Sequence, residues 1–79
     1  MADLLIVGDE PAIADGYARF FERSGHVVRR AGTGESALRA YEERRPDVIL
    51  LDLRLPDMTG LDVFSRIRDD EQTVIMISG

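Results

Sequence analysis

The stretch of the chain that decides the fold is Asp47-Val48-Ile49-Leu50-Leu51-Asp52-Leu53-Arg54-Leu55-Pro56-Asp57-Met58-Thr59-Gly60. Its first part, Val48 to Leu51, is a continuous apolar run, which is typical of a strand covered on both faces. The run ends on an acidic residue, Asp52, and the segment after it contains the turn formers Pro56 and Gly60. The stretch therefore predicts a buried strand that presents a carboxylate at its carboxyl end.

Three more segments have strand character. Leu4 to Val7 and Val74 to Ile77 are short apolar runs of the same kind, and His26 to Arg30 is a weaker candidate after the Ser24-Gly25 break. Segments of helix length separate these strands, so strand and helix alternate along the whole chain. This alternation predicts an α/β layer fold with a parallel sheet and right-handed crossovers.

Apolar residues at helical spacing predict the three helices between these strands. The first is expected from Pro11 to before Gly25, the second from after Thr33 to before Pro46, and the third from about Gly60 to Arg68 with Thr59 as its cap. The side chains expected to face the core are Ile13, Tyr17, Phe20 and Phe21 in the first helix, Ala37, Leu38 and Tyr41 in the second, and Leu61, Phe64 and Ile67 in the third.

Composition excludes several classes of function. The 79 residues carry a formal net charge of −5, which argues against direct nucleic-acid binding by this segment. The chain has no cysteine, so thiol catalysis and a cysteine zinc site are impossible. All ten basic residues are arginine. No apolar run is long enough for a signal peptide or a membrane span, and we expect a cytoplasmic protein without membrane contact.

Acidic residues follow two of the predicted strands. Asp9 and Glu10 come after the first strand, and Asp52 ends the third. The carboxyl ends of the strands are where ligands bind in doubly wound sheets. Carboxylates that converge there repel one another unless a cation lies between them, and an all-oxygen ligand set favours Mg²⁺. Glu10 is also placed to cap the first helix, so its role stays open between cap and ligand.

Three segments resemble the receiver domain of bacterial two-component response regulators in order, spacing and strand position. They are Ile6-Val7-Gly8-Asp9-Glu10-Pro11, the Asp47 to Gly60 stretch quoted above, and Val74-Ile75-Met76-Ile77-Ser78-Gly79. The resemblance covers the whole chain, and the last segment is similar to receivers of nitrogen-regulatory-type transcription activators. It implies a flavodoxin-like, doubly wound parallel sheet with strand order 2-1-3-4.

The resemblance also implies a role for each site residue. Asp52 would accept the phosphoryl group. Asp9 would be a direct Mg²⁺ ligand and the backbone carbonyl of Arg54 another. Ser78 would be the switch hydroxyl that turns toward the phosphoryl group, and Gly79 the small residue that leaves the site accessible.

Partners follow from the same resemblance. The phosphoryl donor would be a phosphohistidine on a sensor histidine kinase, and the output domain of the parent chain would bind DNA. Such a domain is not an enzyme in its own right, because it catalyses at most its own phosphorylation and dephosphorylation.

Two features depart from the family pattern. Gly8 stands where the family usually has the first of two adjacent acids, so a carboxylate is missing near the metal, and Glu10 would compensate only in part. The chain also ends at the fourth strand, so residues 1–79 would be a receiver domain that is incomplete at its C-terminus. We therefore expect bare apolar surface and an open sheet edge, and with them a homodimer or other self-association.

Two other functions compete with this hypothesis. A phosphatase of the haloacid-dehalogenase type also uses an aspartate nucleophile with Mg²⁺, but it needs an acid two residues later, where this chain has Arg54. The second alternative is a fragmentary receiver that acts only as a protein-interaction module, without phosphorylation.

Overall fold

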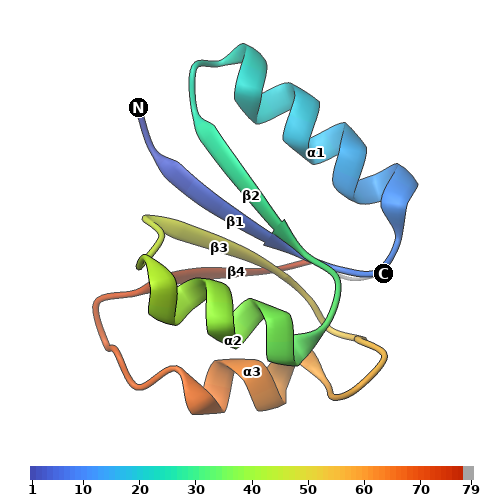
Figure 1. Cartoon of the computed structure of the whole chain (residues 1–79), viewed down its shortest axis with the longest axis vertical. Helices are drawn as coiled ribbons and strands as arrows, with labels where there is room; N and C mark the ends of the chain where they lie inside the picture. Colours follow the sequence, from blue (N-terminus) through green and yellow to red (C-terminus); the bar gives the residue numbers. More distant parts are fainter. Residues whose placement is uncertain (78–79) are drawn as a thin grey trace.

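The computed structural model describes residues 1–77, in which strands and helices alternate as predicted (Figure 1). In chain order the elements are β1 (Asp3–Val7), α1 (Pro11–Arg23), β2 (Val27–Ala31), α2 (Gly34–Glu43), β3 (Val48–Asp52), α3 (Gly60–Arg66) and β4 (Thr73–Ile77). Each element overlaps the segment expected from the sequence, and the main difference is that α3 ends two residues early.

The four strands form one parallel sheet with the order β2-β1-β3-β4, so the predicted order is confirmed. Val7 of β1 lies opposite Leu51 of β3, and Asp52 lies opposite Ile77 of β4. All carboxyl ends therefore meet at one edge of the sheet, and the edge beside Asp52 is where the site is expected.

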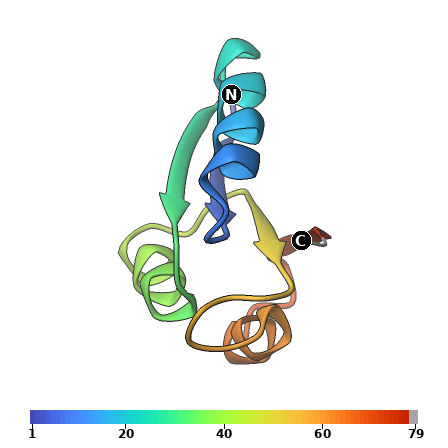
Figure 2. The ribbon, with the colours of Figure 1, turned by 90° about the vertical axis from the view of Figure 1, so that its right-hand side faces the viewer.

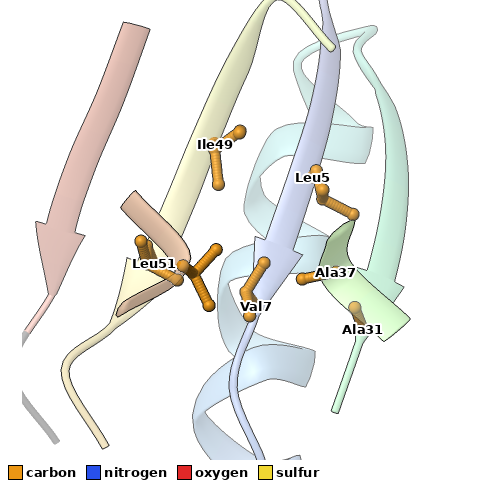
Figure 3. Packing of buried hydrophobic residues seen from close by; sticks show 7 residues of the cluster. Leu5, Val7, Ala31, Ala37, Ile49 and Leu51 are labelled. Carbon is orange, nitrogen blue, oxygen red and sulfur yellow. The ribbon is translucent and has the colours of Figure 1, made fainter. Parts of the chain in front are cut away.

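The helices lie on both faces of the sheet. Figures 1 and 2 show α1 on one face, and α2 and α3 side by side on the other. The two faces bury separate sets of side chains: Ile6 and Leu50 pack with α1, whereas Leu5, Val7, Ile49 and Leu51 face α2 and α3 (Figure 3). Coverage on both faces explains why these strands are apolar at every position.

Two of the helices begin with the capping box that their sequences allow. The Thr33 hydroxyl accepts a hydrogen bond from the Ser36 N–H, and the Thr59 hydroxyl accepts one from Asp62 N–H. In each box the third helical side chain also accepts a bond from the cap residue's N–H. These bonds satisfy amides that a helix start leaves unpaired, and they set where α2 and α3 begin.

The predicted inner faces of α1 and α3 are wrong in part. The side chains of α1 that pack on the sheet are Ala14, Ala18 and Phe21, whereas Ile13, Tyr17 and Phe20 are exposed. In α3 the buried side chain is Val63, with Ile67 partly buried, whereas Leu61 and Phe64 are exposed. The small side chains of Ala14 and Ala18 let α1 pack closely on the sheet, and the stripe of larger side chains is left on a side of the helix that does not face the sheet.

The predicted face of α2 is correct, since Ala37 is buried and Leu38 and Tyr41 pack against the same cluster. The longest helix within residues 1–77 is α1, with 13 residues, and no helix described there has the length and hydropathy of a membrane span.

Candidate functional site

Asp52 is the last residue of β3 and is buried, with 6 % of its surface exposed. Its neighbour across the sheet edge is Gly8, which follows β1. A Cβ atom at Gly8 would lie 3.5 Å from both Cβ and Oδ2 of Asp52, so only van der Waals contact separates the two residues. The sheet therefore holds the Asp52 carboxylate at a fixed position where β1 and β3 both end.

The loop after β3, residues 53–59, contributes a hydrogen bond to the Asp52 side chain. The Arg54 N–H donates to Asp52 Oδ1 over 3.2 Å. The loop is closed by bonds from Leu55 N–H to the Met58 carbonyl (3.1 Å) and from Gly60 N–H to the Leu53 carbonyl (2.9 Å). The backbone N–H of Arg54 thus orients Oδ1 of Asp52, and Oδ2 lies beside Gly8.

Asp9 and Glu10 are both exposed in the turn between β1 and α1. Asp9 lines a shallow pocket together with Gly8, Pro11, the last two residues of β2 and Gly32. Glu10 occupies the N-cap position of α1, but its side chain makes no capping hydrogen bond. Of the two roles left open for Glu10, the cap is met in position only, and a role as metal ligand stays a prediction.

The candidate metal ligands at this edge of the sheet are oxygen atoms, which is the ligand type that Mg²⁺ prefers. Within residues 1–77 no group of three or more His, Cys, Asp or Glu side chains is arranged to hold a metal. Magnesium sites commonly use one or two carboxylates and keep several waters. The Asp9 and Asp52 carboxylates and the Arg54 carbonyl belong to this chemical type. Ser78 and Gly79, the other two predicted site residues, lie outside the described residues.

Sequence reasoning did not predict the contacts that three residues make in and around the loop after Asp52. Gly60 lies against the Asp52 backbone, where a Cβ atom would be 2.3 Å from the carbonyl oxygen. Asp57 and Met58 contact the first turn of α2. The only sequence signal for these roles was their place in the Leu-Pro-Asp-Met-Thr-Gly segment.

Together these features define a class of protein: an open, doubly wound parallel sheet with a buried aspartate at the carboxyl edge where its two central strands end. The comparisons with known proteins give the family. Residues 4–79 match the model of the response regulator receiver domain, and the chain belongs to this family.

Three similar proteins illustrate the relationship. The probable transcriptional regulatory protein TcrX of Mycobacterium tuberculosis is 42 % identical over 67 residues, which cover 85 % of this chain and 29 % of TcrX. The response regulator TrrA of Thermotoga maritima, solved in complex with Mg(2+)-BeF, is 29 % identical with a TM-score of 0.92 over 99 % of this chain and 70 % of TrrA. NtrX of Brucella abortus is 38 % identical, also with a TM-score of 0.92, over 99 % of this chain and 19 % of NtrX.

The chain therefore spans about a third or less of the length of the curated regulators that it matches first. The most similar curated proteins are mainly transcriptional regulators, although one relative is a protein-glutamate methylesterase of Hahella chejuensis. The part that these proteins share with this chain is the receiver fold.

Proposed function

We propose that this chain belongs to a receiver domain that accepts a phosphoryl group on Asp52 from a sensor histidine kinase. In this proposal the domain works in the cytoplasm and controls an output domain that regulates transcription. The observation that carries the proposal is the Asp52 carboxylate itself, which is buried at the end of β3 with Oδ1 held by the Arg54 N–H. The transcriptional relatives support the output part.

The described residues account for how a carboxylate could be the nucleophile. Pairing with β4 fixes the Asp52 backbone, and the Arg54 N–H orients Oδ1, so less orientational freedom is lost when the carboxylate attacks phosphorus. A bond forms from an Asp52 oxygen to phosphorus while the bond to the donor's leaving group breaks. Positioning of this kind supplies much of the catalysis in phosphoryl transfer.

Magnesium fits this site, and Asp9, Asp52 and the Arg54 carbonyl would hold it, with Glu10 as a further candidate ligand. When bound, the ion would neutralise the charge on the carboxylates and on the transferred group. The solved structure of TrrA with Mg(2+)-BeF supports this choice of metal for a protein of the same fold.

The direct test is to incubate the chain, within its intact parent protein where it has one, with Mg²⁺ and a small phosphodonor such as acetyl phosphate. Mass spectrometry should show one added phosphoryl group on the peptide that contains Asp52. The adduct should be lost in base, as expected for an acyl phosphate. No adduct, or an adduct on another residue, would overturn the proposal.

Gly8→Asp is expected to strengthen Mg²⁺ binding, by about tenfold in Kd. The space at Gly8 accepts a side chain, since its added Cβ would meet only Asp52 at ordinary contact distance and its φ is not positive. A carboxylate there would add a negative ligand beside Asp52, in the place where the family usually has an acid. Mg²⁺ titration followed by NMR or fluorescence measures the affinity.

Gly8→Ala is the matched control, because it fills the same space without adding charge. Its Kd for Mg²⁺ should stay within a factor of about two of the unsubstituted chain, whereas Asp9→Asn should weaken binding. If Gly8→Asp bound Mg²⁺ more weakly than Gly8→Ala, the metal would not lie between these strand ends.

The 79-residue chain is also expected to self-associate. β4 is one of the two outer strands of the described sheet, with Ile75 exposed, and Ile13, Tyr17 and Phe20 are exposed along α1. Hiding a few hundred Å² of such surface per subunit contributes on the order of 10 kcal/mol at roughly 25 cal/mol per Å², against about 4–15 kcal/mol for association. Light scattering at micromolar concentrations should show a dimer or larger species, and a compact monomer would contradict this expectation.

The same exposed residues favour one alternative, a receiver fold that acts only through protein contacts. Gly8 adds to this alternative because it removes a carboxylate from the site. The phosphodonor experiment separates the two, since an interaction module would bind partners and gain no mass at Asp52.

A further inference from the structure

The loop that follows Asp52 is fastened to the start of α2 by the carboxylate of Asp57. Asp57 Oδ1 accepts a hydrogen bond from the Gly34 N–H over 2.8 Å, and Oδ2 accepts one from the Glu35 N–H over 3.0 Å. Both amides belong to the first turn of a ten-residue helix, where N–H groups have no partner within the helix. The loop thus supplies two hydrogen bonds and a negative charge to the positive end of α2.

A second contact at the same place is made by packing. Met58, the next residue of the loop, covers Gly34 so closely that a Cβ atom on Gly34 would lie 2.4 Å from Met58 Cγ. Gly34 is buried although it begins a helix. The loop and α2 are therefore joined by a charged pair of hydrogen bonds and by a close-packed side chain, over a sequence separation of more than 20 residues.

The charge state of Asp57 suits this role. The Gly34 and Glu35 amides hold the pKa of the Asp57 carboxyl below its usual value, so the carboxylate is ionised at neutral pH. At the other end of the loop, the Arg54 N–H donates to Asp52. One short loop, residues 53–59, thus contacts the proposed phosphoryl acceptor at one end and α2 at the other.

We propose that Asp57 is a positioning residue for the Asp52 site: its bonds to α2 hold the loop that carries the Arg54 N–H and carbonyl in place. This inference rests on the proposed function and adds a consequence to it. Because Asp57 bonds the loop to the Gly34 and Glu35 amides, a change at Asp52 that moves the loop should change the environment of these two amides.

The test compares the unsubstituted chain, in its parent protein where it has one, with Asp57→Ala and Asp57→Asn. Acetyl phosphate with Mg²⁺ is the probe, and two quantities are measured: the rate of phosphorylation at Asp52 and the ¹H–¹⁵N shifts of the Gly34 and Glu35 amides. Asp57→Ala should phosphorylate about tenfold more slowly, and its two amides should no longer respond to phosphorylation. Asp57→Asn keeps one acceptor oxygen, so it should restore part of the phosphorylation rate and part of the amide response.

Glu35→Gln is the matched control, because Glu35 is also a carboxylate in the first turn of α2 but its side chain pairs with Arg39 on the same helix. It removes charge at the helix start without breaking the link to the loop, so both readouts should stay close to those of the unsubstituted chain. Normal phosphorylation in Asp57→Ala, or an unchanged amide response, would overturn the positioning role and leave the proposed function standing. An unsubstituted chain that gains no phosphoryl group would overturn the proposed function, and the positioning role with it.

Discussion

The Asp52→Asn chain is expected to form no phosphoryl adduct, with the signal falling to background under conditions in which the unsubstituted chain is labelled. An amide at this position cannot provide the anionic oxygen that attacks phosphorus, and it is a poorer ligand for a divalent cation. This is the largest effect on activity that the proposed function predicts. Intact-protein mass spectrometry after incubation with acetyl phosphate and Mg²⁺ measures it.

Loss of the adduct is informative only if the variant folds, and the structure indicates that it will. Asparagine has nearly the same volume as aspartate, and its Oδ1 can still accept the hydrogen bond that the Arg54 N–H donates. The thermal melt of Asp52→Asn should therefore remain cooperative. A folded variant that still carried the label, for example on Asp9 or Glu10, would show that the nucleophile had been assigned to the wrong carboxylate.

Asp47→Asn is a suitable control, because Asp47 directly precedes β3 at the opposite end from Asp52. Its Oδ2 accepts a hydrogen bond from the Asp3 N–H over 2.7 Å, so the substitution also affects an aspartate with a backbone partner. It lies far from the carboxyl edge of the sheet and should leave labelling at Asp52 unchanged.

The sheet could be predicted from the sequence because its signal is local. Leu4 to Val7 and Val48 to Leu51 are apolar at every position, and only strands covered on both faces require this. The first of these strands is followed by Asp9 and the second ends at Asp52, so the parallel arrangement predicted the sheet edge at which the site is expected. The sequence placed Asp52 at the end of a buried strand, and the structure confirms that position, since Asp52 is the last residue of β3 and is buried.

The helix faces and the loop contacts could not be predicted in the same way. In α1 an alanine stripe and a stripe of larger side chains both have helical spacing, and which one faces the sheet depends on how closely the helix approaches. Phe20 is 65 % exposed although its type favours burial. The bonds of Asp57 to α2 join segments that only the crossover brings together, so no local pattern reports them.

Gly60→Ala is expected to have the largest effect on stability, a loss of about 3 kcal/mol in the free energy of unfolding. The added Cβ would lie 2.3 Å from the Asp52 carbonyl oxygen and 3.1 Å from Leu53 Cα. These are backbone atoms of β3 and of the loop after it, so no side chain can turn aside to make room. Either α3 or the end of β3 must move, and both movements disturb the bond from Gly60 N–H to the Leu53 carbonyl.

Two other glycines serve as controls, because they show whether the loss at Gly60 comes from its contact with backbone atoms or from replacing any glycine. The nearest atoms to a Cβ at Gly34 belong to the Met58 side chain, which is flexible and can shift, so Gly34→Ala should cost about 1 kcal/mol. Gly16→Ala lies within α1 with nothing inside 4 Å, and should stabilise the chain by roughly 0.5–1 kcal/mol through helix propensity. Urea unfolding at one fixed protein concentration would rank the three variants.

In a thermal melt the Gly60→Ala loss corresponds to a fall of roughly 12–24 °C, since about 1 kcal/mol shifts the melting temperature of a domain of this size by roughly 4–8 °C. The variant should also lose phosphorylation at temperatures where the unsubstituted chain is still folded, because the displaced backbone is that of Asp52. A Gly60→Ala chain as stable as Gly16→Ala would mean that α3 does not begin against the end of β3. In that case the loop that orients Asp52 would have a different path.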